Sequence, residues 1–196
     1  MSRGVAITLA VVGGLFALVL LVGAMVGLNY AHTRNTLVEK DQAVKEAWSN
    51  VDTQLQRRAD LIPNLVETVK GFARQETTVF GEIANARAGL LNAHGPEAKM
   101  AANGKLDSAI GRLLMLQENY PELKSNEQFL RLQDELAGTE NRITVARKRY
   151  NESLKDYNTT VLSFPASIWA SMSGFQVNNA YFEASEAART APQVKF

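Results

Sequence analysis

The residues best suited to chemistry form one polar cluster, Arg57, Arg58, Asp60, Asn64 and Glu67. Guanidinium and carboxylate groups this close could form a recognition surface or a buried ionic lock. Alternatively, Arg57 and Asp60 make a solvated pair on one helix face, while Arg58 alone points inward against a carboxylate. Because catalytic carboxylates need a pocket that perturbs their pKa, the cluster is expected to be structural.

A second polar group lies further along the chain. Its members are Glu140, Asn141, Arg142, Arg147, Tyr150 and Asn151. Arg147 flanks an apolar stripe, so it could fix the register of neighbouring helices if it faces Glu67 or Glu76. Tyr150 falls on the stripe itself.

Patterns typical of enzymes and metal sites are missing from this sequence. His32 and His94 stand far apart, and no His-Glu-x-x-His, Gly-x-Ser-x-Gly, P-loop or Gly-x-Gly-x-x-Gly pattern occurs. The net charge is +1, with 21 basic and 20 acidic residues mixed along the chain. A nucleic-acid partner is therefore not expected, because such binders need a basic stripe. No catalytic residue, metal or cofactor is predicted.

The first element that must position these residues is a membrane span. No Asp, Glu, Lys or Arg lies between Arg3 and Arg34, and residues 5–28 are almost wholly apolar. As a helix this stretch reaches roughly 36 Å, enough to cross a hydrocarbon core of about 30 Å. The alternative is a cleaved secretory signal, but the apolar run is long for one and no Ala-x-Ala site follows it. Residues 1–30 are predicted to be an uncleaved anchor.

Small residues recur within this anchor and could form a packing face between spans. They are Ala6, Ala10, Gly14, Gly23 and Gly27. Chance is the alternative, because small residues are common in membrane helices. Basic residues flank both ends of the span, and long domains translocate despite modest positive charge, so the body is placed outside the cytoplasm.

Four amphipathic helices are predicted over residues 31–163, with no strand pattern between them. Pro63 is expected to end the first helix, and the others meet at Gly95-Pro96 and Pro121. Their apolar stripes run over residues 37–62, 65–90, 98–119 and 129–161. With no proline before Pro63, the anchor could continue into the first helix as one rod. Short joints favour an antiparallel up-and-down four-helix bundle over a two-chain coiled coil.

The segment 164–196 is rich in aromatic residues, namely Phe164, Trp169, Phe175, Tyr181, Phe182 and Phe196. Such a tail is expected to dock on the bundle or on a neighbouring subunit.

Several of these residues also carry a family resemblance. The run from Gln54 to Gly71 reads QLQRRADLIPNLVETVKG, and further matches include Glu140-Asn141-Arg142-Ile143, Tyr150-Asn151 and Phe164-Pro165. The sequence resembles the LemA family of bacterial membrane proteins over nearly its whole length. The resemblance implies a single anchor in the inner membrane and a helical body, but no established activity or active site.

Two functions from different classes follow. The first is a structural protein that self-assembles into a homo-oligomer through its span and helical body. The alternative is a binding module that presents the polar joint around Pro63 to another membrane or envelope protein. An enzyme would need carboxylates that converge in a closed pocket.

Overall fold

The computed structural model describes residues 3–182, with side chains from Val11 onward. Every regular element in this range is a helix and no strand occurs in it, so the predicted all-α class is confirmed. The main helices are α1 (Arg3–Lys70), α2 (Thr77–Asn92), α3 (Pro96–Met115) and α5 (Glu127–Leu162). Three short elements complete the fold: η1 (Leu116–Glu118), α4 (Pro121–Lys124) and α6 (Ala166–Met172).

Helix α1 is continuous over 68 residues, as predicted for an anchor that runs on into the first amphipathic helix. From Val11 to Leu28 all of its side chains are exposed. Within the described residues it is the one helix long and apolar enough to cross a membrane. A signal sequence meets the same criteria, so the anchor itself stays a prediction.

The predicted helix end at Ile62-Pro63 is wrong, because Pro63 lies inside α1. Proline has no amide hydrogen, so the carbonyl of Ala59 loses its usual donor four residues later. Arg87 of α2 replaces that donor: its Nε bonds to the Ala59 oxygen at 2.8 Å. The chain turns only after Lys70, so the second predicted helix is shortened to α2 and the stripe residues Leu65 and Val69 belong to α1.

This compensation makes a prediction for a double-mutant cycle. Arg87→Met should cost about 1–3 kcal/mol of unfolding free energy, because it leaves a carbonyl without a donor. In a Pro63→Ala background the cost should fall by roughly 1 kcal/mol, since the amide of residue 63 then bonds to Ala59. Urea unfolding of the four proteins measures both values.

Arg74→Met is the matched control, since Arg74 is exposed in the turn after α1. Its cost should be near zero in both backgrounds. If the changes in unfolding free energy of Pro63→Ala and Arg87→Met simply add, the contact between Arg87 and the Ala59 carbonyl does not explain why α1 continues through Pro63.

The remaining helix boundaries lie close to those predicted from the sequence. Helix α3 begins at Pro96, directly after Gly95, whose φ of 79° favours glycine. Its continuation through η1 covers most of the third predicted helix. Helix α5 has 36 residues and matches the long fourth stripe. The short helix α6 lies within the segment predicted only as a tail.

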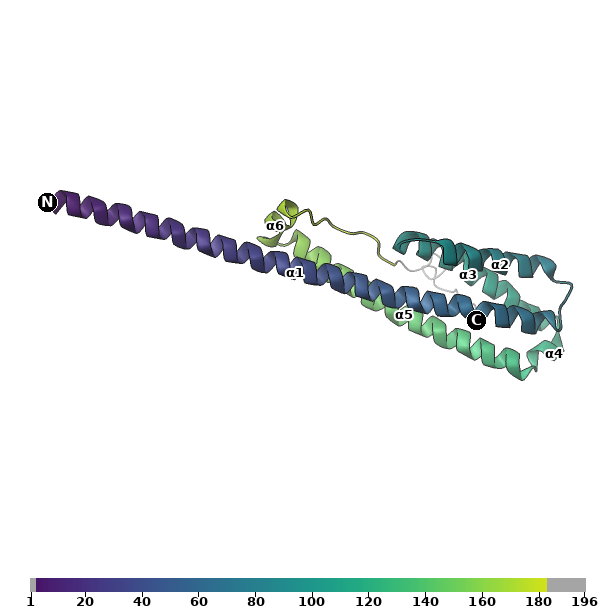
Figure 1. Ribbon diagram of the computed structural model, residues 1–196. Helices are drawn as coiled ribbons and strands as arrows, with labels where there is room; N and C mark the ends of the chain where they lie inside the picture. Colours follow the sequence, from purple (N-terminus) through teal and green to yellow (C-terminus); the bar gives the residue numbers. More distant parts are fainter. Residues whose placement is uncertain (1–2, 183–196) are drawn as a thin grey trace, which may run out of the picture. The chain divides into compact units, whose positions relative to one another are not determined.

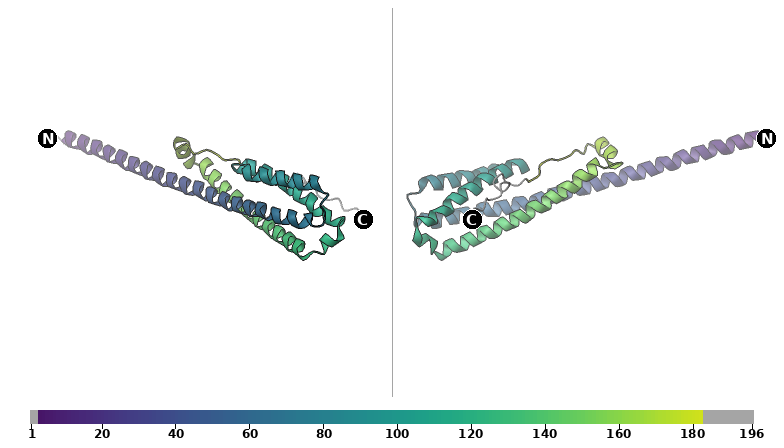
Figure 2. Two further views of the ribbon diagram at one scale, coloured as in Figure 1. Left: turned by 45° about the vertical axis from the view of Figure 1, so that its right-hand side comes forward. Right: turned by 180° about the vertical axis from the view of Figure 1, so that it is seen from behind.

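Contacts divide the chain into two compact units. Among the described residues, the first unit holds 3–43 and 155–178, and the second holds 44–154 and 179–182. In the second unit α2 and α3 lie side by side (Figures 1 and 2). The core there draws on α1, α2, α3 and α5, with fully buried members Val51, Leu55, Leu65, Ile83, Leu106, Leu113, Phe129 and Ile143. The domain boundaries predicted at residues 30 and 163 stay predictions.

The first unit combines the first part of α1 with the end of α5, α6 and the segment after it. The side-chain amide of Asn158 makes two hydrogen bonds to the extended chain. Its Nδ2 donates to Asn178 O at 2.6 Å, and its Oδ1 accepts from Asn178 N at 2.9 Å. Tyr157 donates its hydroxyl hydrogen to Gln176 O at 2.9 Å. These bonds fix residues 176–178 along the last turns of α5.

Candidate functional site

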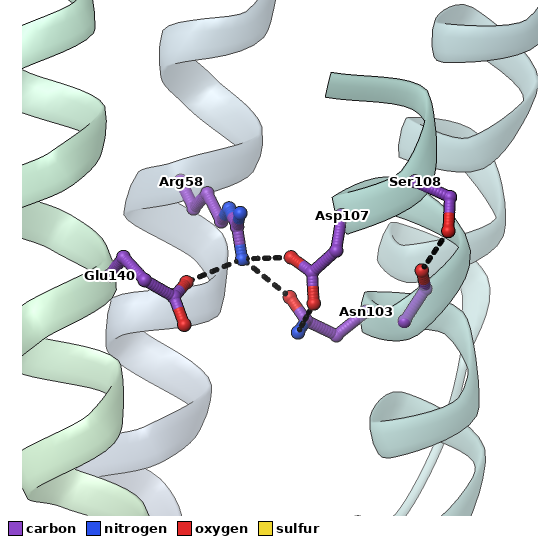
Figure 3. Close-up of polar contacts among 6 residues, drawn as sticks. Arg58, Asn103, Asp107, Ser108 and Glu140 are labelled. Atoms are coloured by element: carbon purple, nitrogen blue, oxygen red, sulfur yellow. Dashed lines mark hydrogen bonds and ion pairs between the residues drawn. The ribbon is translucent and has the colours of Figure 1, made fainter. Parts of the chain in front are cut away.

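The most developed polar site lies inside the second unit and centres on Arg58 (Figure 3). This side chain is only 8% exposed. Its Nη1 atom pairs with Asp107 of α3 and, at 2.8 Å, with Oε2 of Glu140 of α5. The same nitrogen donates to Oδ1 of Asn103 at 3.3 Å. One guanidinium of α1 thus joins two other helices. Arg58, Asn103, Asp107 and Glu140 are called the Arg58 cluster below.

Helix α3 supplies two members of the Arg58 cluster from one face. Asn103 and Asp107 are four residues apart, a spacing that brings side chains together on a helix. Asn103 is buried, and its Nδ2 donates to Oδ2 of Asp107 at 3.1 Å. The amide therefore bridges guanidinium and carboxylate, accepting from one and donating to the other.

Opposing effects act on the pKa of Asp107 within the Arg58 cluster. Burial raises the pKa of Asp107 above its ordinary value of 3.8, and the like charge of Glu140 acts in the same direction. The positive charges of Arg58 and Arg147 oppose this rise. Two carboxylates share one buried cation, so each depends on Arg58 for its compensation.

The contacts of the Arg58 cluster have the arrangement of an ionic lock between helices. Buried ion pairs of this kind fix the register of helices, because a slipped helix leaves a charge unpaired. Among the described residues, no group of three His, Cys, Asp or Glu is placed to hold a metal.

An aromatic group occupies another part of the second unit. Tyr150 is 1% exposed and meets Trp48 edge-on, with ring centroids 5.6 Å apart. Phe182 stacks on Trp48 at 6.1 Å and meets Tyr150 at 5.6 Å. Asn151 holds Phe182 in place, since its amide bonds to both the N–H and the C=O of that residue at 2.9 Å. Trp48, Tyr150 and Phe182 are called the aromatic box.

Arg147 contacts the aromatic box and not Glu67 or Glu76, the two partners considered from the sequence. Its guanidinium carbon lies 5.0 Å from the centre of the Phe182 ring, a cation–π contact. Glu67, its proposed partner, pairs instead with Lys70 at 2.9 Å. Glu76, the other proposed partner, accepts a hydrogen bond from the Tyr120 hydroxyl at 3.0 Å. The idea that Arg147 faces Glu67 or Glu76 is therefore corrected: an aromatic ring faces the cation.

The other predicted residues around Pro63 face away from Arg58. Arg57, Asp60, Asn64 and Glu67 are all exposed and recur at steps of three or four along α1, so they form one outer stripe. Asp60 accepts a bond from Gln56 Nε2 at 3.0 Å. The structure thus separates Arg58 from these four residues, called the outer stripe. The idea of a joint at Pro63 is wrong, since the stripe lies on an unbroken helix.

The small residues of the apolar stretch remain open to close approach. A Cβ atom added at Gly14, Gly23 or Gly27 would meet nothing within 4 Å. Ala6 and Ala10 fall among the residues whose side chains lie outside the described part of the structure.

Three residues of these sites, Arg87, Asn103 and Asp107, were not predicted from the sequence. Asn103 and Asp107 carried a signal, because they are polar residues four apart beside the apolar Leu106 and Ile110. Arg87 and Asn103 have partners far away in sequence, at Ala59 and Arg58. No local pattern announces such partners.

Comparisons with known proteins support the resemblance. The model of the LemA family matches residues 47–196, more than half of the chain. Magnetosome proteins MamQ 1 and MamQ 2 of Paramagnetospirillum magneticum are each 25% identical over 182 residues, covering 80% of this chain and 66% of theirs. Protein LemA of Metamycoplasma hominis is 24% identical over 161 residues, covering 82% of this chain and 73% of its own. The chain spans just under two thirds of the MamQ proteins.

Proposed function

This chain belongs to the LemA family, and from that premise we propose that it is a membrane-anchored structural protein that assembles into a homo-oligomer. The observation that carries the proposal is the contrast within α1. Every residue of its apolar stretch from Val11 to Leu28 is exposed, while from Leu37 onward the same helix contributes buried core residues. Exposed apolar surface of this length needs lipid or other spans around it.

Assembly through the span follows from its small residues. Gly23 and Gly27 form a Gly-x-x-x-Gly pattern, while Gly14, nine residues before Gly23, is open on the opposite face of the helix. Such positions let two helices approach closely, so that their backbones gain van der Waals contacts that lipid does not supply. The span would lie in the bacterial inner membrane as a single pass, with the body outside the cytoplasm.

The helical body would serve as the rigid part of the assembly. We propose that α1, α2, α3 and α5 pack as an up-and-down bundle, with the aromatic tail docked on it or on a neighbouring subunit. The Arg58 cluster supports a rigid role, because it pins α1 to α3 and α5 by charge. The names of the relatives are not enzyme names, which supports a role without catalysis.

The test is the oligomeric state of the full chain, measured by light scattering in detergent and by cross-linking in membranes. The wild-type chain should be oligomeric in both. Replacing Gly14, Gly23 and Gly27 together by Leu should shift it to smaller species, because the spans can no longer approach. Val19→Leu is the matched control, since it enlarges another exposed residue of the same span. A wild-type monomer in both measurements would refute the proposal.

The second candidate is an adaptor for another envelope protein, which would bind along the outer stripe. The observation that favours it is the run of exposed polar residues from Arg57 to Glu67 within the family-like motif. Co-purification separates the two functions. A stoichiometric foreign partner that is lost in Arg57→Glu and Asp60→Lys, while the homo-oligomer persists, would support the adaptor.

A further inference from the structure

The first unit exposes a second apolar surface besides the span. Leu162 at the end of α5 is 67% exposed, Phe164 in the following link is 83% exposed, and Met172 at the end of α6 is 71% exposed. Ile168 of α6 is about half exposed. These four side chains are called the α6 patch. Large apolar side chains gathered within so short a segment mark a contact surface.

The α6 patch is held beside the end of the apolar stretch. Trp169 of α6 donates its indole hydrogen to Oδ1 of Asn29 at 2.9 Å. Its ring meets that of Tyr30 edge-on, with centroids 5.5 Å apart. Asn29 and Tyr30 directly follow Leu28, where the exposed apolar run ends. Helix α6 (Figure 1) is therefore fixed at the level where the span would leave the hydrocarbon.

The residue types suit that level of a bilayer. Tryptophan and tyrosine are enriched where the membrane meets water, because their rings are apolar and their N–H or O–H is polar. Between Asp156 and Glu183 the sequence has no Asp, Glu, Lys or Arg. A segment without charged side chains enters the lipid interface without the cost of dehydrating a charge, whereas a charged one would resist it.

Packing fixes the other side of α6. Ala170 is 1% exposed, and the N–H of Phe175 bonds to its carbonyl at 3.0 Å. Since α6 is buried on the Ala170 side and pinned through Trp169, the exposed side chains of the α6 patch keep a defined position. They do not belong to a loose terminus.

We propose that the α6 patch inserts into the lipid interface next to α1, as a second membrane contact made by the same chain. Lipid is favoured over a second copy or a protein partner because Trp169 holds α6 against Asn29 and Tyr30, directly after the exposed apolar stretch of the span ends. The inference rests on the proposed membrane anchoring, since without the span nothing places α6 at a bilayer.

The absence of cysteine in this chain allows a direct test. Phe164→Cys and Met172→Cys are each labelled with a polarity-sensitive fluorophore. The full chain is then placed in vesicles of phosphatidylglycerol and phosphatidylcholine that carry nitroxide-labelled lipids. Val145→Cys is the matched control, because Val145 is an exposed apolar residue of α5 in the other unit. Labels at 164 and 172 should be quenched several-fold more by nitroxides near the headgroup than the label at 145.

A label at Val22→Cys, inside the apolar stretch, separates the two hypotheses. If nitroxides deep in the acyl chains quench this label while those at 164 and 172 behave like the one at 145, the α6 patch does not enter lipid, although the anchor stands. Labels shielded from aqueous quencher but untouched by nitroxide lipid would mean that protein covers the patch, which also overturns the inference. If the label at 22 is not quenched, the anchor itself fails and the inference with it.

Discussion

Arg58→Met is expected to lower the melting temperature of the full chain by about 10 °C. Removing one partner of a buried ion pair costs about 3–5 kcal/mol, because the remaining charges stay buried without compensation. Asp107 and Glu140 are each 41% exposed at the side chain, so we expect a loss near the lower end, about 3 kcal/mol. For a chain of this size, each kcal/mol shifts the melting temperature by roughly 2–4 °C. Far-UV circular dichroism measures the shift.

Arg57→Met is the matched control for this experiment. It makes the same chemical change one residue earlier, on the exposed outer stripe, and should move the melting temperature by less than about 2 °C. Methionine and arginine have similar helix propensity, so neither variant weakens α1 itself. Equal losses in the two variants would show that Arg58 contributes no more than a surface charge.

The deficit of Arg58→Met should also depend on pH, with a sign set by Asp107. Its pKa is raised in the folded protein, so the folded state binds the proton more tightly than the unfolded chain. The stabilisation from protonating it is present at low pH and is lost as pH rises through the raised pKa. Without Arg58 that pKa should rise further, since the largest opposing charge is gone.

The gap between variant and wild type should therefore shrink as pH falls from neutral toward acid. Adding Asp107→Asn and Glu140→Gln to Arg58→Met should recover part of the loss at neutral pH, because both uncompensated charges are removed. A gap that widens in acid would contradict the assignment of the deficit to stranded carboxylates.

Tyr150→Ala is expected to destabilise the second unit by about 3–5 kcal/mol, the usual cost of truncating a buried large aromatic residue. The ring of Tyr150 contacts both other members of the aromatic box, so its loss leaves a cavity and frees Phe182 on one side. Urea unfolding followed by far-UV circular dichroism measures the change.

Tyr150→Phe separates the ring from its hydroxyl. The Tyr150 hydroxyl oxygen is buried without a hydrogen-bond partner among the described residues, and burial raises the pKa of this group. Removing the hydroxyl should change stability by less than about 0.5 kcal/mol, or increase it, because no bond is lost. A loss above about 1 kcal/mol would mean that the hydroxyl is bonded, for instance to water.

Sequence alone determined the local features of this protein. The charge-free stretch before Arg34 predicted one long apolar helix, and the spacing of Phe129, Leu136 and Ile143 predicted α5 almost to its ends. Both signals come from residues that are neighbours in the chain, since periodicity of 3.6 residues depends only on the helix itself. The inward side chain of Arg58 was also among the sequence hypotheses, but its partners were not.

Only the tertiary structure decided where helices end against their local preference and which polar groups meet. Pro63 looked like a helix end until Arg87, from another helix, supplied a donor for the Ala59 carbonyl. Arg58 pairs with Asp107 of α3 and Glu140 of α5, and Arg147 lies over the ring of Phe182. In each case the partner is a residue distant in sequence. Such pairing is a property of packing, which no local spacing records.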